Sequence, residues 1–310
     1  MRPFEEGDYE DIVKINNEIY PDNIMTVEET RHKDAINYES ANLRRWVAET
    51  DGNMVGYCYF QNMLWDYDPK RFDMGILVTP SCQGRGIGSE VYNYLMKRLS
   101  DMSPVSVCCW FRDEDKNIRF LKNRGFYKKQ RESISRLDVR SWSEEPYLDI
   151  FKRLDSKGIK IITLKDFMLT PDWVSILYDL EREVALDVPG ATSVPELAVW
   201  KRSVLDSKFF LPEGYFMAVD GDDIIGMSNV LSRPTKGFYE IGLTGVRGAY
   251  RGLGIATALK VKCISYLKSI DAATLETGNE ENNKLILKIN KKLGFKSVPD
   301  WLQYEKICKQ

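Results

Sequence analysis

The chain has 310 residues, which suggests two domains of about 150 residues that can each bury a core. Its 44 basic and 46 acidic residues leave a formal net charge of −2 without a dense lysine or arginine run, so we expect no nucleic-acid partner. The chain has a single histidine, His32, which excludes a zinc site made of several imidazoles. A Ser-His-Asp triad would have to be built on His32 alone. We therefore expect neither metal nor triad chemistry.

The amino terminus carries acidic residues where a signal peptide needs an apolar core, and no apolar stretch approaches the ~18 residues of a membrane span. The six cysteines form no CxxC pair, and several lie within apolar patterns, which favours buried free thiols. We therefore expect a cytoplasmic protein that does not associate with a membrane.

Apolar patterns of period two and period 3.6 predict the elements of the first half. In chain order these are strand 2–4, helices 8–19 and 27–38, strands 45–48 and 54–60 around a turn, strand 74–78, a helix to residue 99, strand 105–110, helix 115–123 and strand 133–137.

The second half repeats this order, beginning with strand 160–164 and helix 173–186. The turn at Asp51-Gly52 returns at Asp220-Gly221, and Gly125-Phe126 returns at Gly294-Phe295. The charged segment between the two halves is interpreted as a linker. The sequence therefore predicts an N-terminal domain over residues 1–142, a linker over 143–157 and a C-terminal domain over 158–310.

Two glycine-rich hexapeptides open a helix at equivalent places in the two halves, 168 residues apart. They are Gln83-Gly84-Arg85-Gly86-Ile87-Gly88 and Arg251-Gly252-Leu253-Gly254-Ile255-Ala256. The first turn of a helix has unpartnered N–H groups and the positive end of the macrodipole, and glycine lets an anion approach both. Neither copy has the lysine and hydroxyl of a P-loop or the third glycine of a dinucleotide-binding fingerprint.

With these hexapeptides in place, the order of elements resembles the GNAT acetyltransferase superfamily over nearly all of both halves. The most specific stretches are Thr244–Lys260, Thr277–Asn283 and Ile289–Phe295. The resemblance implies an α/β fold of two tandem acyl-CoA N-acyltransferase domains, each with a mixed, mostly antiparallel sheet and flanking helices. It also implies acetyl-CoA as the co-substrate and a primary amine of a small molecule or peptide as the acceptor.

Position by position, the resemblance assigns the cofactor contacts. Val246 and Val78 would meet the pantetheine arm between two splayed parallel strands, and residues 251–256 and 83–88 would hold the pyrophosphate. Asn283, together with Asn279, would add polar contacts in the second half, whereas the first half has Glu114 in place of Asn283. Because a carboxylate is a poor neighbour for a polyanion, the second half is the better-equipped cofactor site.

The reaction implied is direct attack of a neutral amine on the thioester, assisted by a base. Some family members carry a glutamate eleven residues before the loop, and this position is Glu240 in the second half and Phe72, next to Asp73, in the first. The tyrosine that many members use as the acid is replaced by Asn290 and Leu121. The thiolate either leaves unassisted or is protonated by another tyrosine, such as Tyr250 or Tyr304.

We therefore expect an N-acetyltransferase whose second half is catalytic and whose first half is a non-catalytic acyl-CoA-binding or structural module. A sensor that binds acyl-CoA without turnover is the alternative. Candidate acceptor-binding residues are Asp187, Val188 and Pro189 in the second half and Tyr20 and Asp22 in the first.

Overall fold

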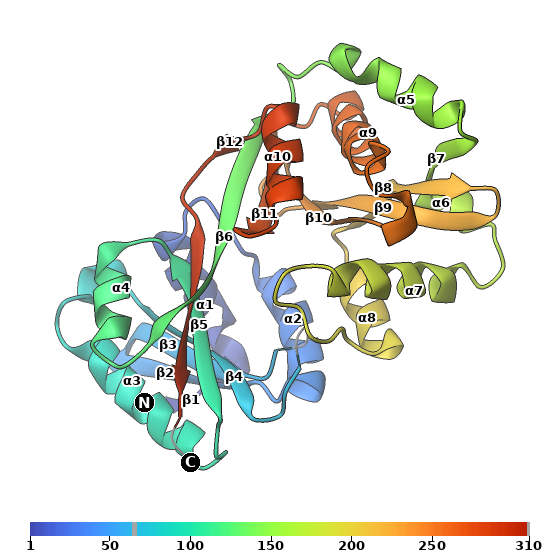
Figure 1. Ribbon diagram of the computed structural model, residues 1–310. Helices are drawn as coiled ribbons and strands as arrows, with labels where there is room; N and C mark the ends of the chain where they lie inside the picture. Colours follow the sequence, from blue (N-terminus) through green and yellow to red (C-terminus); the bar gives the residue numbers. More distant parts are fainter. Residues whose placement is uncertain (64–66, 309–310) are drawn as a thin grey trace. The chain divides into compact units, whose positions relative to one another are not determined.

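The computed structural model describes residues 1–63 and 67–308 and divides the chain into two compact units (Figure 1). Unit 1 comprises Met1–Arg131 and Trp301–Gln310, and unit 2 comprises Glu132–Asp300. The carboxyl-terminal strand therefore belongs to the unit that begins the chain. Among the described residues, no helix has both the length and the apolar character needed to cross a membrane.

Unit 1 is a mixed sheet with helices on both faces. Its strands follow the order β1-β2-β3-β4-β5-β13, with β4 and β5 as a parallel pair and antiparallel pairing between the other neighbours. Its elements are β1 (Arg2–Pro3), α1 (Tyr9–Ile19), α2 (Val27–Ser40), β2 (Arg44–Thr50), β3 (Asn53–Gln61), β4 (Arg71–Val78), α3 (Ile87–Ser100), β5 (Ser106–Arg112), α4 (Asp115–Lys122) and β13 (Trp301–Ile307).

Unit 2 repeats this architecture in the order β6-β11-β10-β9-β8-β7, with β10 and β11 as its parallel pair. Strand β6 (Tyr127–Asp138) starts in unit 1 and continues into unit 2. The other elements are α5 (Leu148–Asp155), β7 (Ile159–Thr163), α6 (Leu164–Phe167), α7 (Trp173–Leu186), α8 (Leu197–Val204), β8 (Phe210–Asp220), β9 (Asp223–Ser232), β10 (Phe238–Val246), α9 (Ile255–Ser269), β11 (Thr274–Glu280), α10 (Lys284–Leu293) and β12 (Lys296–Ser297).

The two halves of the sequence exchange their last strands. The predicted strand 133–137 does not close the first half, because β6 pairs antiparallel with β11 of unit 2, from Asp138↔Thr274 to Glu132↔Glu280. In return, β13 pairs with β5 of unit 1. The compact units therefore differ from the predicted division at residues 142 and 158.

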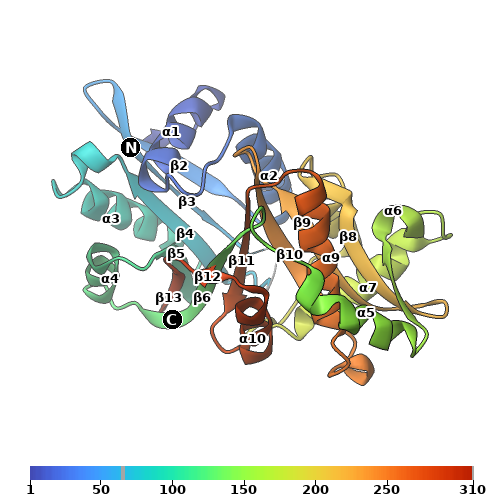
Figure 2. The same ribbon diagram turned by 90° about the horizontal axis from the view of Figure 1, so that it is seen from above.

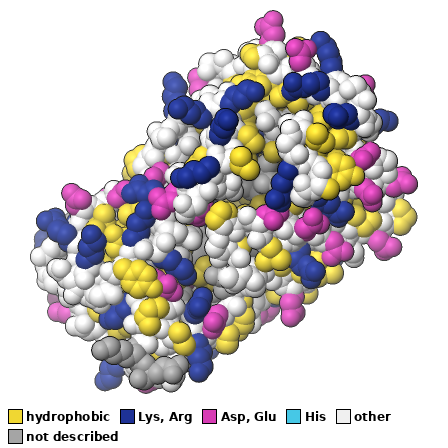
Figure 3. Space-filling model, in the orientation of Figure 1, with side chains coloured by type: hydrophobic (Ala, Val, Ile, Leu, Met, Phe, Trp, Pro, Cys, Tyr) yellow, Lys and Arg dark blue, Asp and Glu magenta, His cyan; other side chains and the backbone are white. Residues whose placement is uncertain are grey.

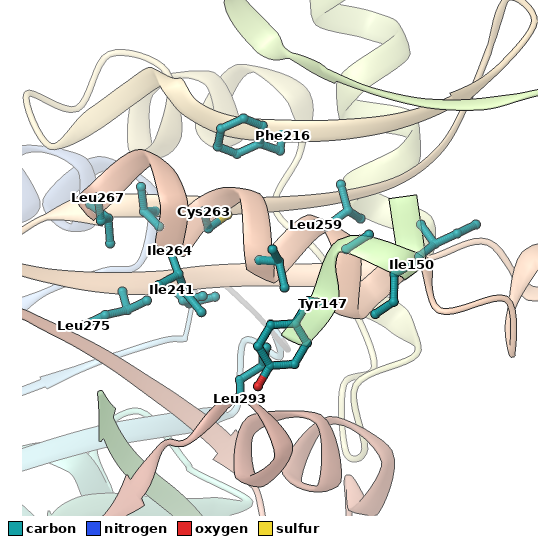
Figure 4. Packing of buried hydrophobic residues seen from close by; sticks show 14 of the residues in the cluster. Tyr147, Ile150, Phe216, Ile241, Leu259, Cys263, Ile264, Leu267, Leu275 and Leu293 are labelled. Atoms are coloured by element: carbon teal, nitrogen blue, oxygen red, sulfur yellow. The ribbon is translucent and has the colours of Figure 1, made fainter. Parts of the chain in front are cut away.

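The segment expected to be a linker, residues 143–157, is part of the core of unit 2. It contains α5, whose Ile150 and Leu154 are buried in the same cluster as Leu259 of α9 (Figure 4). Tyr147, just before α5, donates a hydrogen bond of 2.7 Å from its hydroxyl to the carbonyl oxygen of Lys292. Burying these side chains stabilises the segment, because apolar area leaves water.

The parallel strands of each unit pair only at their beginnings. In unit 2 the register runs from Phe238↔Thr274 to Ile241↔Thr277, and β10 then carries a bulge before Thr244. In unit 1 it covers Arg71–Asp73 with Ser106–Cys108, although both strands continue. We call the place where this pairing ends the fork of each unit.

The two faces of the unit 2 strands are covered differently (Figures 1 and 2). Ile241 and Leu275 pack into the cluster that contains α9, whereas Leu243 packs with α7. Gly245 allows α7 to approach β10, because a Cβ at this position would lie 2.3 Å from the Cβ of Val184. We refer to these faces as the α9 face and the α7 face.

Cysteine burial agrees with the sequence analysis. All six cysteines are free, and Cys58, Cys108, Cys109 and Cys263 are buried, while Cys82 and Cys308 are half-buried. Burial raises the pKa of the Cys58 and Cys263 thiols to about 12, so both remain protonated at neutral pH.

Candidate active site

The glycine loop of unit 2 has the geometry expected of an anion cradle. Gly252 and Gly254 have φ values of +81° and +91°, in the left-handed region that favours glycine, and Gly254 is the N-cap of α9. A Cβ at Gly252 would meet nothing within 4 Å, so the space over the loop is open. The N–H groups of the first helical turn have no partner within the helix and are available to a phosphate.

Arg251 fixes the loop to the end of β10. Its Nε donates to the carbonyl oxygen of Val246 over 3.0 Å, and its Nη2 pairs with the carboxylate of Asp187 at the end of α7. Both side chains of this ion pair are about half exposed. Arg251 therefore already has an anionic partner at the place where a cofactor phosphate is expected.

A cavity of 420 Å³ lies beside this loop. Of the predicted cofactor contacts, it brings together Val246, Arg251, Gly252, Gly254, Ile255, Ala256 and Asn283. The acceptor candidates Asp187 and Val188 also line it. The cavity thus joins the start of α9, the start of α10 and the end of α7, and its volume lies within the range of ligand pockets.

Four site residues predicted for the second half do not line this cavity: Leu253, Asn279, Glu240 and the acceptor candidate Pro189. Leu253 packs against the core of unit 2. The side-chain oxygen of Asn279 accepts a hydrogen bond of 2.6 Å from Nδ2 of Asn290, which is buried. Asn279 therefore joins β11 to α10 on the α9 face.

Asn283 is the N-cap of α10, where its Oδ1 accepts from the N–H of Ile286 over 3.4 Å. Its counterpart Glu114 in unit 1 instead forms an ion pair of 3.1 Å with Lys116. The amide of Asn283 carries no charge, so a cofactor phosphate beside it meets no repulsion, whereas the carboxylate of Glu114 would repel one.

Glu240 lies on the α7 face of β10, because its neighbour Ile241 packs on the α9 face. Its Oε2 accepts a hydrogen bond of 3.0 Å from Nη1 of Arg233, and its side chain is one-third exposed. The carboxylate is thus accessible and held by a cation, two residues before the bulge at the fork.

Several residues that line the cavity were not predicted from the sequence. They are Val184, Thr244, Gly245, Thr257, Leu285, Ile286, Lys288 and Ile289. Leu285 is 75% exposed. The apolar side of α10, to which Leu285 belongs, is the sequence feature that could have identified these residues as part of a site. The sequence of α10 also contains four lysines, and dark-blue side chains gather over this part of the visible face in Figure 3.

The loop of unit 1 has the same backbone geometry, with φ of +76° at Gly84 and +89° at Gly86. Nε2 of Gln83 donates to the carbonyl oxygen of Val78 over 2.9 Å, as Arg251 does to Val246. Arg85, Ile87 and Gly88 complete this hexapeptide, and Ile87 and Gly88 already belong to α3. Both loops therefore share the backbone geometry expected of an anion cradle.

The main cavity of unit 1 lies elsewhere, along its fork. It has a volume of 330 Å³ and is lined by residues 74–77 of β4, residues 109–111 of β5 and Trp301 of β13. Val78 and residues 83–88 are not among its lining residues. This cavity of unit 1 thus does not include the predicted cofactor contacts.

Neither candidate base position of unit 1 offers an accessible carboxylate. Phe72 is buried in the core. Asp73 is also buried, which raises the pKa of its carboxyl group to about 7, although the Tyr59 hydroxyl donates to it over 3.4 Å and lowers the pKa in part. Glu240 of unit 2, by contrast, is one-third exposed.

The two candidate tyrosine acids are engaged in other contacts. The Tyr250 hydroxyl donates to Oδ2 of Asp220 over 3.0 Å, and this hydrogen bond raises the pKa of Tyr250. Tyr304 lies in β13 of unit 1 and is buried in that unit's core. Asn290 cannot donate a phenolic proton.

Comparison with known proteins agrees with this geometry. The sequence profile described as "Acetyltransferase (GNAT) family" matches residues 9–126 and again residues 177–295. A curated relative, a mycothiol acetyltransferase from Geodermatophilus obscurus, is 22% identical over 255 residues, which cover 79% of this chain and 76% of the relative.

Solved structures share the fold over the whole chain. A GCN5-related N-acetyltransferase from Sphaerobacter thermophilus superposes with a TM-score of 0.71 at 18% identity, covering 99% of this chain and 94% of that one. A tandem GNAT protein from the clavulanic acid biosynthesis pathway gives a TM-score of 0.70 at 16% identity and covers 100% and 98%. The chain belongs to the GNAT acetyltransferase family, as an acetyl-CoA-dependent N-acetyltransferase with two GNAT domains.

Proposed function

We propose that this protein transfers the acetyl group of acetyl-CoA to a primary amine of a small molecule or peptide, and that unit 2 is the catalytic unit. The observation that carries the proposal is the 420 Å³ cavity, which joins the open glycine loop to Asn283 and to the end of α7. Unit 1 has a loop of the same shape, but its cavity does not reach that loop.

In this proposal the first-turn N–H groups of α9 hold the pyrophosphate, and Arg251 and Asn283 border it. Lys288, at the cavity wall, adds a positive charge for a further phosphate. The pantetheine arm follows the end of β10 at Val246 toward the fork. The residues present fit a polyphosphorylated cofactor, because the loop is open and its neighbours on α10 are neutral or basic.

The amine must be neutral when it attacks, and a primary alkyl amine is mostly protonated at neutral pH. Glu240 accepts the proton, directly or through a water molecule, and the ion pair with Arg233 holds its carboxylate in place. The amine nitrogen forms a bond to the acetyl carbon, the carbon–sulfur bond breaks, and the electron pair leaves with the thiolate.

We assign no protein acid to the thiolate. Asn290 has no acidic proton, Tyr250 already donates to Asp220, and Tyr304 belongs to the core of unit 1. A thiol has a pKa of about 8.5, so its conjugate base is a tolerable leaving group at neutral pH. Solvent then supplies the proton.

Amine-dependent release of free CoA tests the function. Purified protein is incubated with acetyl-CoA and a panel of primary amines, and the new thiol is titrated while the acetylated product is identified by mass. Transfer to at least one amine, well above hydrolysis without amine, is expected. A protein that binds acetyl-CoA but never exceeds the hydrolysis rate would instead be a sensor, and the proposal would be wrong.

A further inference from the structure

Strand β10 contains one extra residue at the place where its pairing with β11 ends. The antiparallel register with β9 shifts between Ile241 and Thr244, so Gly242 and Leu243 together oppose Asn229. Two residues of one strand against one of its neighbour form a β-bulge, which bends the strand. The parallel register with β11 also ends at Ile241, so the bulge lies where the fork of unit 2 opens.

The side chain of Asn229 holds this bulge from the neighbouring strand. Its Oδ1 accepts a hydrogen bond of 2.8 Å from the backbone N–H of Leu243. A Cβ at Gly242 would lie 2.7 Å from the same oxygen, so glycine is needed there for the amide to come this close. Asn229 is only 4% exposed, and its amide supplies the partner that the N–H of the bulged residue needs.

The extra residue decides which backbone groups at the end of β10 face the fork. The N–H of Arg247 donates to the carbonyl oxygen of Ile225, over 2.9 Å, and so points toward β9. Backbone groups of successive strand residues point to opposite edges, so those of Val246 point away from β9. Its carbonyl oxygen accordingly accepts from Arg251. A shift of one residue would reverse this arrangement from Thr244 onward.

The residues that follow the bulge are those that reach the cofactor cavity. Thr244, Gly245 and Val246 line the 420 Å³ cavity, whereas Asn229 and Leu243 do not. In unit 1, the register of β4 with residues 56–61 of β3 runs without a shift. The bulge and the amide that holds it therefore distinguish the described part of the unit 2 fork from that of unit 1.

We infer that Asn229 is a positioning residue for acetyl transfer: it fixes the bulge of β10, and the bulge directs the backbone of Val246 toward the pantetheine arm. This rests on the proposed function, in which the arm follows the end of β10 in unit 2. Asn229 acts through Leu243 and touches neither the cofactor nor the acceptor. Because the phosphates bind at the glycine loop, Asn229 matters for the arm and not for the phosphates.

Asn229→Ala tests the assignment, because it removes the acceptor of the Leu243 N–H. Isothermal titration compares acetyl-CoA with ADP, which has a pyrophosphate but lacks the pantetheine arm. The Kd for acetyl-CoA should rise about fivefold, the scale of one hydrogen bond, while the Kd for ADP stays unchanged. A general loss of structure in unit 2 would weaken both ligands, so the contrast separates positioning from stability.

A second variant disturbs the bulge and leaves Asn229 in place. Gly242→Ala adds a methyl group that pushes the amide of Asn229 away from the N–H of Leu243. It should weaken acetyl-CoA and spare ADP in the same way. The matched control is Thr163→Ala, which removes another side-chain acceptor of a backbone N–H in unit 2, that of Asp166. Thr163 does not line the cavity, and both affinities should stay as in the wild type.

The outcomes separate the inference from the proposed function. If the wild type transfers acetyl groups but Asn229→Ala and Gly242→Ala keep its affinity for acetyl-CoA, the role of Asn229 is wrong and the proposed function stands. The role is also wrong if the two variants lose affinity for ADP and acetyl-CoA equally. If the wild type transfers nothing, the proposed function fails and the inference fails with it.

Discussion

In the proposed function, Arg251 exchanges one anion for another when the cofactor binds. It pairs with Asp187 in the structure, and the pyrophosphate is expected at the same loop. Because both partners are about half exposed, the pair contributes less than ~1 kcal/mol. The ion pair therefore adds little to the stability of the fold. Its proposed role is to compete with the cofactor phosphate for Arg251.

Replacing Asp187 with Asn tests this competition. The variant frees Arg251 and removes a negative charge from the cavity wall, so its affinity for CoA should rise about two- to fivefold. Pantetheine, which lacks phosphate, should bind the variant and the wild type equally. Isothermal titration with both ligands measures the effect, and a weaker affinity for CoA would show that Asp187 helps to hold the cofactor.

Glu240→Gln keeps the size of the side chain but removes the proton acceptor. General bases contribute ~100-fold or more to catalysis, so kcat should fall by about that factor while the KM for acetyl-CoA stays the same. The measurement is the initial rate at saturating amine and acetyl-CoA for the variant and the wild type. A kcat within about twofold of the wild type would remove Glu240 from the mechanism.

At the residue scale, the sequence predicted what depends on local spacing. Gly252, Gly254 and Arg251 could be identified because a loop at the start of a helix is defined within six residues. Lys288 could not, because its proximity to the cavity depends on how α10 packs. Asn279 matched the family pattern, yet in this structure it is bonded to Asn290.

Helix α9 carries a buried charge behind the cofactor loop. Lys260 is fully buried, its Nζ has no hydrogen-bond partner among the described residues, and the Phe295 ring lies 5.8 Å away. Burial lowers the pKa of Lys260 to about 8, from 10.5 when exposed. This lowering of the pKa corresponds to about 3 kcal/mol of destabilisation at neutral pH.

Lys260→Met should therefore stabilise the protein, by an amount that depends on pH. Below pH 8 both folded and unfolded wild type are protonated, and the full penalty applies. Between pH 8 and 10.5 the folded state binds fewer protons than the unfolded state, so wild-type stability rises with pH and the advantage of the variant shrinks. Urea unfolding at pH 7 and pH 10 measures the difference, and an advantage that grows with pH would contradict the account.

At the element scale, the order of strands and helices was predictable, but the partners of the last strands were not. The predicted strand 133–137 and the strand Trp301–Ile307 occupy equivalent places after the Gly-Phe pairs of the two halves. Nothing in their periodicity distinguishes β5 from β11 as a neighbour, because strand pairing is decided by tertiary packing. The helix α5 was mistaken for a linker because its buried partners lie far along the chain, in α9.

At the scale of the whole molecule, the strand exchange makes unit 1 depend on the last strand of the chain. A chain ending at Asp300 lacks β13, which pairs with β5 from Trp301↔Arg112 to Ile307↔Ser106. The core of unit 1 would lose Leu302 and Tyr304. Loss of buried residues of this size costs several kcal/mol, so unit 1 should unfold at a lower temperature.

Hydrogen exchange followed by mass spectrometry checks this prediction peptide by peptide. In the shortened chain, protection should be lost in β5 and its neighbours in unit 1 and kept in β8 and β9 of unit 2. Equal protection of β5 in both chains would mean that β13 does not support unit 1.

The central claim is that acetyl transfer takes place at the loop of unit 2. The two loops offer a matched pair, because Gly254 and Gly86 are both N-caps with φ near +90°. Alanine at either position adds a Cβ over the anion cradle and about 1–2 kcal/mol of left-handed strain.

The most direct measurement is the steady-state rate of amine acetylation by Gly254→Ala and Gly86→Ala, with circular dichroism to establish that both fold. The account predicts a KM for acetyl-CoA raised about tenfold in Gly254→Ala and unchanged in Gly86→Ala, and the reverse pattern would contradict it.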